Sequence, residues 1–498
     1  MFDTPPDLLR ATAVSVTGQT SQEFEWVVLD NGSTSPDVVA AISELAVDPR
    51  VNHHRVESNV GIVGGMRICL DEARGQYVVP LDADDVLVPD ALETLADEIA
   101  SHGRPAFLYS DEDMLLDDVL HAPYLRPDWD PVLNLCTSYA FHLCAFRRDE
   151  ARRLGVYSDP GAEWCHDWDT ISRFATAGHE PLHVPQVLYH WRMHPSSSTN
   201  RARPVEGSLV SQRHLLERLL AERGLADLFE VVPFPLVRGA PEWWLRRRRR
   251  RPHSFAVVRL TVDRAEPVSP PDAFAQRAEY PFEGLEELRV DGECFPARLK
   301  EAAERLGSRF TAICSDELEP EGNEWPWEAV GLAELHPDVA FVAGRILNAD
   351  RVVLAGQEIL GFDGFAGCPE RGRGETDPGY FALALKQRSV SAVHPSFFVA
   401  ETDFLIDALR SLPATASFCF LGAWLGAYAL EQGRRVAFSP LVQALARPGF
   451  EAGQDPTEEE EPEFLRTYGH LLPDVRWYSR HFGRSFESAY QLREVPGA

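Results

Sequence analysis

The first half of the sequence predicts an α/β fold, in which a parallel β-sheet is covered by helices. Short apolar runs alternate with amphipathic helical patterns, and this alternation is typical of such a fold. Acidic residues also follow directly on two of the apolar runs, at Asp30 and at Asp82 to Asp85. Ligands bind at the carboxyl ends of strands in open sheets of this kind, so the acidic residues predict a polar site at that edge.

The expected elements follow one another in a regular order. Each apolar run is long enough for one strand, and each helical pattern is bounded by turn or capping residues, such as Asp90 before the last helix and Gly103 after it. The expected strands cover residues 24–30, 51–57, 76–82 and 105–111. The expected helices cover residues 6–19, 37–46, 63–73 and 90–103.

A chain of 498 residues is too long for one typical domain, so two or three domains are expected. The alternation of apolar runs and helical patterns stops after an amphipathic helix over 208–224. Two tryptophans and six consecutive arginines, Arg246 to Arg251, follow this helix and predict a solvated linker. The predicted parts are a first domain over 1–235, the linker over 236–252, a second α/β domain over 253–450, and an acidic, solvated tail and extension over 451–498.

Composition excludes several classes of protein. The formal charge of −29 leaves no broad basic face, which disfavours a nucleic-acid partner. Eight scattered cysteines without a CxxC pair indicate reduced thiols and no zinc ribbon. The N-terminus lacks a signal-peptide pattern and no run could span a bilayer, so we expect a cytoplasmic protein. Tryptophans beside Arg246 to Arg251 also suit an anionic membrane surface, a peripheral contact that is the alternative to a solvated linker.

The segment "YVVPLDADDVLVPD" places Asp82, Asp84 and Asp85 after a strand. Carboxylates two residues apart can converge on one hard cation, and oxygen ligands suit Mg²⁺ or Mn²⁺. Such a cation would hold a nucleotide diphosphate. The alternative is a strand end before a solvated helix N-terminus, where acidic residues favour the helix dipole.

Four further segments favour the site over that alternative. "VVLDNGSTSPD" brings Asp30, and "NVGIVGGMR" is a glycine-rich loop that fits neither a dinucleotide fold nor a P-loop. "CHDWDT" brings Asp167 and Asp169, and "LYHWRMHPSSST" brings further histidines and an arginine.

Together with "YSDEDM" and "RPDWDP", these segments occur in the order and spacing of family 2 glycosyltransferases of the GT-A fold, which the sequence resembles from about Phe2 to Thr199. The resemblance is greatest to the subgroup that builds O-antigens and other bacterial cell-surface polysaccharides. It implies a metal-dependent, inverting hexosyl- or rhamnosyl-type transferase. It further implies Mg²⁺ or Mn²⁺, a UDP-, dTDP- or GDP-linked sugar as donor, and a glycan or lipid-linked acceptor.

Carried over by position, the resemblance implies separate roles for the residues of the donor site. Asp30 would contact the nucleotide base, and Asn59 would also face the donor. Asp82 would face the ribose and the metal, and Asp84 would bind the metal directly, whereas Asp85 would be a helix-start carboxylate or a support for the metal ligands.

The resemblance also implies a general base. Asp167 would deprotonate the acceptor hydroxyl, from the side opposite the leaving diphosphate. His166 stands where the family usually has Glu or Gln, which keeps Asp169 as an alternative base. The other polar candidates are His190 and His194 for the metal or diphosphate and Arg192 for the diphosphate, each with a structural hydrogen-bonding role as the equal alternative. Residues Tyr109 to Met114 and Trp129 would border the acceptor groove, or Trp129 would be core.

Two departures from the family pattern bear on activity. The family opens with an apolar strand before the turn that Phe2 to Pro5 resembles, so the first domain is expected to lack its first strand. The second half resembles a degenerate copy: Cys314 and Ser315 stand where the leading carboxylate belongs, leaving Asp316 and Glu317. Gly422 and Trp424 replace the acids of the base motif. The second domain is therefore predicted to be catalytically silent.

Two other functions remain open from the sequence. The chain could be an inactive, glycosyltransferase-like binding subunit of a glycan assembly complex. The chain could also be a metal-dependent phosphotransferase, which would use similar carboxylates. That function would not explain the presence of the segments "CHDWDT" and "LYHWRMH".

Overall fold

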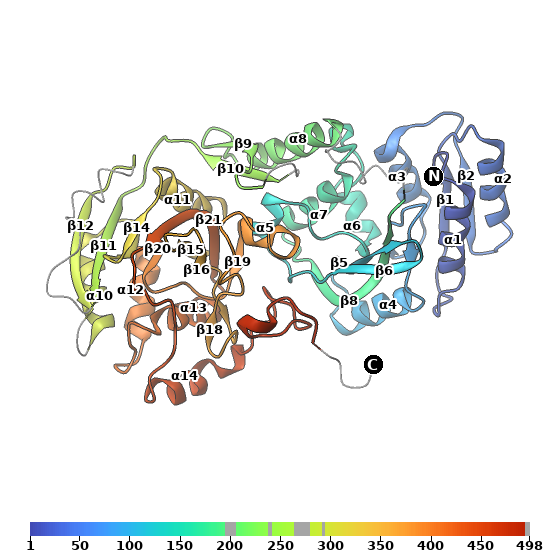
Figure 1. Cartoon of the computed structure of the whole chain (residues 1–498). Coiled ribbons are helices and arrows are strands. Elements are labelled where there is room, and N and C mark those ends of the chain that lie inside the picture. Colours follow the sequence, from blue (N-terminus) through green and yellow to red (C-terminus); the bar gives the residue numbers. More distant parts are fainter. Residues whose placement is uncertain (195–205, 238–241, 263–278, 291–293, 494–498) are drawn as a thin grey trace. The chain divides into compact units, whose positions relative to one another are not determined.

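Two mixed β-sheets, one in each of two structural units, organise the computed structural model of this chain (Figure 1). The structure describes residues 1–194, 206–237, 242–262, 279–290 and 294–493. The first unit comprises Met1–Trp129 and Thr137–Leu225, and the second comprises Asp130–Cys136 and the described residues from Ala226 onward. Helices and strands alternate in both units, which confirms the predicted α/β class.

The first unit contains nearly all the elements that the sequence predicts. Its helices are α1 (Pro6–Thr17), α2 (Pro36–Leu45), α3 (Gly61–Glu72), α4 (Ala91–Ser101), α6 (Arg148–Arg153), α7 (His166–Thr176) and α8 (Glu206–Glu222), with a 3-10 turn, η1, at Pro160–Ala162. Its strands are β1 (Trp26–Asp30), β2 (Val51–Arg55), β3 (Tyr77–Val78), β4 (Val86–Leu87), β5 (Phe107–Leu116), β6 (Val119–Tyr124), β7 (Cys144–Arg147) and β8 (Leu182–Arg192).

The larger sheet of the first unit is mixed, so the prediction of a parallel sheet is wrong for it. Its strand order is β3-β7-β5-β8-β4, with β6 paired to β5, and only the pair β5 and β8 is parallel. The chain reverses tightly between β5 and β6 at Asp117 and Asp118, whose φ angles of 48° and 61° suit a hairpin, and a hairpin makes its strands antiparallel. β1 and β2 form a separate parallel pair. The absence of a first strand stays a prediction.

The second unit is built on a nine-stranded sheet with the path β12-β11-β13-β20-β15-β21-β14, to which β16 and β19 are added. Its strands are β9 (Phe229–Pro233), β10 (Trp243–Arg247), β11 (Phe255–Val262), β12 (Gly284–Val290), β13 (Phe310–Ser315), β14 (Leu318–Pro320), β15 (Val339–Leu347), β16 (Val353–Ala355), β17 (Ile359–Leu360), β18 (Ala366–Gly367), β19 (Arg388–Val390), β20 (Phe397–Glu401) and β21 (Arg435–Ala446). Its helices are α5 (Pro131–Cys136), α10 (Phe295–Leu306), α11 (Trp325–Leu335), α12 (Thr402–Ser411), α13 (Leu421–Glu431) and α14 (Glu460–Tyr468), with 3-10 turns η3 (Tyr380–Leu385), η4 (Gly469–Leu471) and η5 (Phe486–Ser488).

The sheets of the two units share one strand pattern. The path β3-β7-β5-β8-β4 corresponds to β13-β20-β15-β21-β14, and the successive pairs are antiparallel, antiparallel, parallel and antiparallel in both. The added strand β6 on β5 likewise corresponds to β16 on β15. The repeated order supports the expectation that the second half is a related copy of the first. In the second unit β13 also pairs with β11, and β11 with β12.

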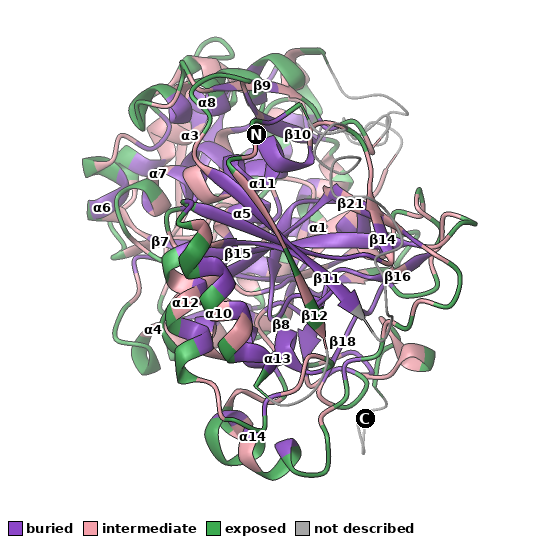
Figure 2. Cartoon of the chain, turned by 90° about the vertical axis from the view of Figure 1, so that its left-hand side faces the viewer, coloured by how far each residue is buried: buried purple, intermediate pink, exposed green. Residues whose placement is uncertain are grey.

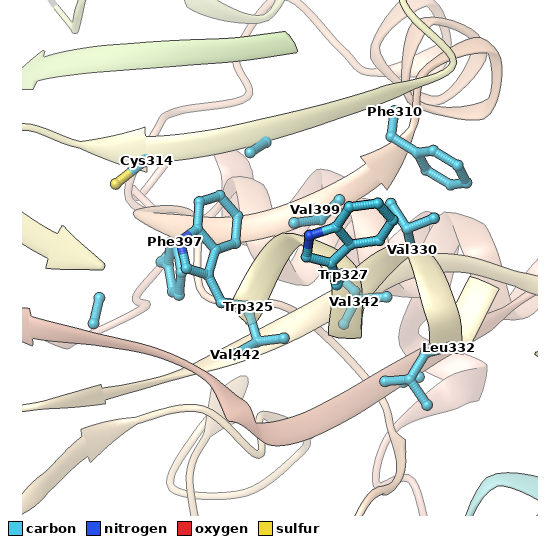
Figure 3. Close-up of a cluster of buried hydrophobic side chains, with 14 of the residues drawn as sticks. Phe310, Cys314, Trp325, Trp327, Val330, Leu332, Val342, Phe397, Val399 and Val442 are labelled. Carbon is cyan, nitrogen blue, oxygen red and sulfur yellow. The ribbon is translucent and has the colours of Figure 1, made fainter. Parts of the chain in front are cut away.

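The core of the second unit gathers around two tryptophans of α11 (Figure 3). The ring of Trp325 lies 5.8 Å from that of Phe397 on β20, and Trp327 contacts Tyr280 at 4.4 Å between ring centres. Every residue of β15 is buried, and Figure 2 shows this strand beneath more exposed helices. Burial of such large apolar side chains is the main stabilising contribution to the unit.

The predicted linker over 236–252 is part of the second unit, which corrects the expected domain boundaries. Trp243 and Trp244 are buried in β10, which pairs with β9, and the Trp244 indole N–H donates to Glu328 at 2.7 Å. Arg247 is also buried and is paired with Glu334. The aromatic and charged side chains find buried partners, so the described part of this segment is not a solvated linker; residues 238–241 lie outside the described residues.

The helix α5 is a second difference from the predicted domains, because it comes from within the first predicted domain but belongs to the second unit. It packs on β10 and β19. Just before it, the Asp130 carboxylate accepts hydrogen bonds from the Ser389 N–H at 2.6 Å and the Ser389 hydroxyl at 2.7 Å.

The predicted acidic tail is largely packed against the second unit. Glu460 is fully buried, and its carboxylate accepts hydrogen bonds from the Ser417 N–H at 2.6 Å and the Thr457 N–H at 3.0 Å. Phe464 and Tyr468 of α14 pack against Trp424 of α13. A solvated tail is therefore wrong for this stretch, because α14 presents apolar side chains to the unit; residues 494–498 lie outside the described residues.

Candidate active site

The loop between β3 and β4 carries the three carboxylates that the sequence singles out, and they differ in exposure. The side chains of Asp82 and Asp84 are 60% and 34% accessible to solvent, whereas Asp85 is buried. Asp85 accepts hydrogen bonds from the Tyr189 hydroxyl at 2.5 Å and the Arg192 N–H at 2.7 Å. Burial, followed by the charge of Asp82, raises the pKa of Asp85 to about 7. Asp85 therefore fastens the end of β8 to this loop.

Asp84 and His194 come together from separate segments of the chain. His194 Nε2 lies 2.8 Å from Asp84 Oδ2, and the Arg192 side chain donates through Nε to the Asp84 carbonyl at 2.9 Å. A carboxylate and an imidazole that converge on one point fit a divalent cation that keeps water and phosphate oxygens as its other ligands. Among the described residues, no group of three or more His, Cys, Asp or Glu side chains forms a metal site. The chain itself would thus supply few of the ligands.

His190 points elsewhere than His194. Its Nδ1 lies 2.5 Å from the Asp113 carboxylate, and its backbone pairs with Val86 across β8 and β4. The structure thus gives His190 a carboxylate partner of its own next to the loop. The motif residues after His194, 195–199, lie outside the described residues.

His142 is a site residue that the sequence reasoning missed. Its imidazole stacks on Tyr189 at 4.7 Å between ring centres, with Nδ1 at 3.2 Å from Glu112 and Nε2 at 3.8 Å from Asp82. Burial lowers the pKa of His142, but the hydrogen bond and charge of Glu112 and the charges of Asp82 and Asp167 outweigh it and raise the pKa to about 10. His142 is therefore an imidazolium at neutral pH, and it places a positive charge among the carboxylates. The available signal was a single histidine within the otherwise apolar segment "YAFHLCAF".

Asp82 lies where these charges meet. Although its side chain is largely accessible, its surroundings raise its pKa: loss of hydration within the site acts first, and His142 opposes it. The like charges of Asp167 and Asp84 raise the pKa further. Asp82, Asp84 and Asp167 are therefore electrostatic neighbours, as carboxylates of one site should be.

Asp167 lies in the first turn of α7, with 27% of its side chain accessible. Its carboxylate Oδ1 is 3.1 Å from Nε2 of His166, the residue at which the sequence departs from the family pattern. The helix begins here after Cys165, so the carboxylate also faces the favourable end of the helix dipole. This position leaves Asp167 open to an incoming hydroxyl.

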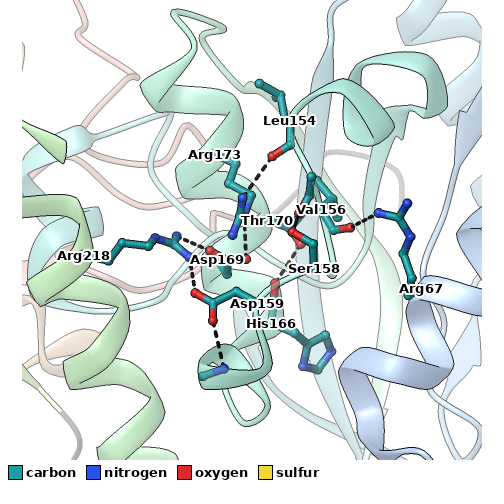
Figure 4. Close-up of polar contacts among 12 residues, drawn as sticks. Arg67, Leu154, Val156, Ser158, Asp159, His166, Asp169, Thr170, Arg173 and Arg218 are labelled. Atoms are coloured by element: carbon teal, nitrogen blue, oxygen red, sulfur yellow. Dashed lines mark hydrogen bonds and ion pairs between the residues drawn. The ribbon is translucent and has the colours of Figure 1, made fainter.

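Asp169, the alternative base, is enclosed by arginines (Figure 4). Its side chain is 2% accessible; it accepts a hydrogen bond from Arg173 Nε at 2.7 Å and is paired with Arg218 of α8. Arg218 also contacts Asp159, at 2.5 Å. A buried carboxylate with two guanidinium partners holds α7 and α8 together and has no room for an acceptor, so this geometry favours Asp167 as the base.

The arginine network predicts a stability effect that is separate from catalysis. Changing Arg218 to Met keeps the apolar stem but leaves Asp169 with one partner, and breaking a buried ion pair costs about 3 kcal/mol or more. We expect Arg218→Met to lower the free energy of unfolding by about 3 kcal/mol in urea titrations. Arg213→Met, at an exposed position of the same helix, is the control and should change it by less than about 0.5 kcal/mol. Equal stability of the two variants would contradict a structural role of Asp169.

Asp30 and Asn59 lie on two neighbouring turns. Asp30 is buried at the end of β1, accepts a hydrogen bond from the Ser33 N–H at 2.8 Å and is paired with Arg55. Asn59 Oδ1 accepts from the Asn31 side chain at 3.2 Å. Gly32, with φ of +80°, lets the turns approach, because a Cβ there would lie 2.7 Å from the Asn59 nitrogen.

The aromatic residues expected near the acceptor groove are buried. Trp129 stacks on Tyr139 at 6.2 Å between ring centres, and Tyr109 donates its hydroxyl to the Pro127 carbonyl at 2.8 Å. Both side chains are almost fully inaccessible. Of the two readings of Trp129, the structure favours core.

Comparison with known proteins finds a protein family that part of this chain resembles. Residues 2–116 match the model of the family described as Glycosyl transferase family 2. An uncharacterized Sinorhizobium fredii protein, y4gI, is 25% identical over 515 residues, covering 97% of this chain and 56% of that protein. The O-antigen biosynthesis protein RfbC of Myxococcus xanthus is 26% identical over 397 residues, covering 74% of this chain and 30% of RfbC. This chain therefore spans about half the length of the first relative and less than a third of the second.

Solved structures overlap with part of the chain. TarS residues 1–349 from S. aureus, in complex with UDP-GlcNAc, gives a TM-score of 0.36 at 17% identity and covers 43% of this chain and 62% of that one. GalNAc-T7 with UDP, GalNAc and Mn²⁺ gives 0.37 at 18% identity, covering 44% and 47%. The match of the family model to β1 through β5, together with the carboxylates at the strand ends, is the basis for assignment. Over residues 2–116, the first unit of this chain is therefore similar to the proteins described as Glycosyl transferase family 2.

Proposed function

We propose that the first unit transfers a sugar from a nucleotide-sugar donor to a hydroxyl of a glycan or lipid-linked acceptor, with inversion and with the help of Mg²⁺ or Mn²⁺. The observation that carries the proposal is the convergence of Asp84 with His194 beside an accessible Asp167. The family match supports it, as does similarity to a protein named for O-antigen biosynthesis. Cell-surface polysaccharide synthesis is the process that this similarity favours.

On the donor side, the proposal assigns the nucleotide to the turns that carry Asp30 and Asn59. Asp82 would face the ribose, Asp84 and His194 would hold the cation, and Arg192 would contact the diphosphate. When bound, the cation would neutralise the charge that develops on the leaving diphosphate. His190 takes a supporting role in the proposal, since Asp113 already occupies its Nδ1.

On the acceptor side, Asp167 accepts the proton of the attacking hydroxyl. The hydroxyl oxygen forms the new bond to the anomeric carbon as the bond to the diphosphate breaks, and attack from the opposite face inverts that carbon. His142 keeps Asp82 in place by charge, and the His142–Glu112 pair fixes the ring. The histidine thus offsets like charges that would otherwise repel one another at the donor site.

Release of UDP, dTDP or GDP from the matching sugar nucleotides by the full chain, with Mn²⁺ or Mg²⁺, tests the proposal. Transfer to an added glycan acceptor should raise the release rate. The second candidate, an inactive binding subunit, is favoured if the chain binds a sugar nucleotide in calorimetry but releases no nucleotide with any acceptor.

The second unit is proposed to be catalytically silent. The start of α13 corresponds to the start of α7, but it carries Gly422 where α7 has Asp167. A Cβ at Gly422 would lie 1.9 Å from the Val393 carbonyl oxygen and 2.5 Å from Gln454 Oε1. Neighbouring backbone and side chain thus fill the place of a base.

This packing predicts that even a methyl group is harmful at this position. Gly422→Ala should lower the free energy of unfolding by about 1–3 kcal/mol or more, because the Val393 backbone must shift. Gly374→Ala is the matched control, since no atom lies within 4 Å of its Cβ position and its φ is not left-handed. Urea unfolding of both variants measures the difference. An unchanged Gly422→Ala variant would show that a side chain, and hence a base, can be accommodated.

The arginine run is better explained by the second unit than by a membrane. Arg246 and Arg248 pair with Glu230, and Arg249 pairs with Glu324. Within the described ranges, none of the helices is long and apolar enough to cross a bilayer. The proposal therefore gives these arginines a structural role.

A further inference from the structure

A cleft opens in the first unit between α3 and the loop over 157–163, which precedes the proposed base Asp167. It holds about 370 Å³ of free space, within the range of about 300–1,000 Å³ for small-molecule sites. Its walls come from Val60 and the N-terminal half of α3, and from side chains of the loop. The cleft therefore has the size of a small-molecule site and lies on the side of the unit from which α7 begins.

The loop is held in place by contacts to two helices. The Glu163 carboxylate accepts hydrogen bonds from the Ile62 N–H at 2.5 Å and the Val63 N–H at 3.1 Å, at the start of α3. Asp159 is paired with Arg218 of α8 at 2.5 Å. Because these contacts fix the loop on both sides, the cleft is a preformed feature of the fold.

Tyr157 connects the cleft with the proposed base. It lines the cleft, and its ring centre lies 6.1 Å from that of His166, the neighbour of Asp167. Burial, followed by the charge of Asp167, raises the pKa of the Tyr157 hydroxyl well above its usual value. A ligand in the cleft would therefore lie near the residue that is proposed to accept the proton.

The polar groups of the cleft suit a neutral ligand. Arg67 donates through Nε to Asp71 at 3.0 Å and through Nη1 to the Val156 carbonyl at 3.4 Å (Figure 4). These bonds use two of the five N–H donors of the guanidinium, and the others can serve a ligand. Among the described residues that line the cleft, Arg67 is the one base and Glu163 the one acid, so their charges balance. Hydroxyl groups pair with guanidinium, carboxylate and hydroxyl groups alike.

Trp164 adds an exposed aromatic ring directly after the loop. The residue is 46% accessible, and its backbone N–H donates to the Ser211 hydroxyl of α8 at 3.4 Å. A Cβ at Gly207 would lie 2.8 Å from the indole nitrogen, so the side chain rests against the start of α8. Val60, in the wall on the α3 side, is 45% accessible. Exposed apolar side chains beside a polar cleft are typical of ligand-binding grooves, and an indole offers a broad apolar face to a pyranose ring.

We propose that this cleft binds one neutral sugar residue of the acceptor, with the apolar face of the sugar ring against Trp164 and its hydroxyl groups bonded to Arg67 and Ser158. The assignment of that sugar to an acceptor rests on the proposed function of the first unit. Bound there, the sugar residue brings its glycan to the side of the site on which Asp167 acts. Trp164 then has the acceptor-binding role that was expected of Trp129.

The test is saturation-transfer NMR on the full chain without donor nucleotide. The probes are D-glucose, D-galactose, D-mannose, L-rhamnose and N-acetyl-D-glucosamine. We expect at least one sugar to bind, and Trp164→Ala to weaken its binding by about tenfold or more, because the apolar face of the sugar loses its partner. Val14→Ala is the control, at an apolar residue of α1 that is 71% accessible, and it should bind as the parent does.

Arg67→Met tests the polar side of the cleft. It keeps the apolar stem but removes the guanidinium donors, so it should also weaken binding by about tenfold. Arg74→Met is the matched control, because Arg74 also pairs with a carboxylate, Glu25, but is 76% accessible and does not line the cleft. Trp164 and Arg67 are both partly exposed, so the variants should unfold at the temperature of the parent. If one variant fails to fold, the other decides.

Weaker binding in the folded variants, with parent-like controls, supports the proposal. Binding of none of the five sugars, binding that survives either substitution in a folded variant, or displacement of the sugar by inorganic phosphate would overturn it. With a glycan acceptor that carries the bound sugar, Trp164→Ala should also raise the KM for the acceptor by about tenfold, and an unchanged KM would remove the assignment to the acceptor. Nucleotide release by the parent is measured separately, so that failure here leaves the transfer proposal standing.

Discussion

Asp84→Ala is expected to lower nucleotide release and sugar transfer by about 10³-fold. Asp84 and His194 are the two side chains that converge on the proposed cation position. A catalytic cation supplies several kcal/mol of transition-state stabilisation, and each 1.4 kcal/mol corresponds to a factor of ten in rate. The measurement is steady-state nucleotide release over a titration of Mn²⁺, in which the variant should also need far more Mn²⁺ for half-maximal rate.

The matched control for this prediction is Asp97→Ala, an exposed aspartate of α4 in the same unit. It should leave both the rate and the Mn²⁺ dependence as in the parent. EDTA should abolish release by the parent, and Mn²⁺ should restore it. Parent-like rates and Mn²⁺ dependence in Asp84→Ala would remove Asp84 from the cation site.

Asp167→Asn is expected to lower the rate of transfer by about 10²–10⁴-fold, the usual contribution of a general base. The amide keeps the shape of the side chain but cannot accept the hydroxyl proton. Donor affinity should change little, because Asp167 is assigned to the acceptor side. The measurements are the turnover number with saturating donor and acceptor, and the dissociation constant of the donor by calorimetry.

Asp169→Asn separates the two candidate bases. Because Asp169 is buried between Arg173 and Arg218, the substitution should reduce the temperature of unfolding and leave the turnover of the folded fraction within about tenfold of the parent. A large loss of turnover in Asp169→Asn with full activity in Asp167→Asn would reverse the assignment.

Much of the first unit was predictable because its local patterns agree with its packing. The apolar runs before Asp30 and Asp82 became β1 and β3, and the helical patterns became α1 to α4. The carboxylates at the strand ends were also predictable, since a strand end brings its following residues to one edge of the sheet. The neighbourhood of Asp84 and His194, however, joins residues 110 positions apart and depends on the pairing of β4 with β8.

The roles of residues with similar sequence signals were decided by long-range contacts. Asp167 and Asp169 stand two positions apart in one motif, yet Arg218 from a distant helix takes only Asp169 out of solvent. His142 carries no motif of its own and enters the site because β7 places it beside Glu112 and Asp82. The protonation of His142 depends on the charges of these neighbouring carboxylates, whose positions cannot be read from the sequence.

The sequence by itself determined the fold class, the strand-end carboxylates and the resemblance that led to the family. Composition gave wrong predictions for two charged stretches. The tryptophan- and arginine-rich stretch was expected to be a solvated linker but forms β10. The acidic tail was expected to be solvated, but its Glu460 is a buried hydrogen-bond acceptor. Only the tertiary structure decided these cases, because the solvation of a charge or an indole depends on which partners from distant segments replace water.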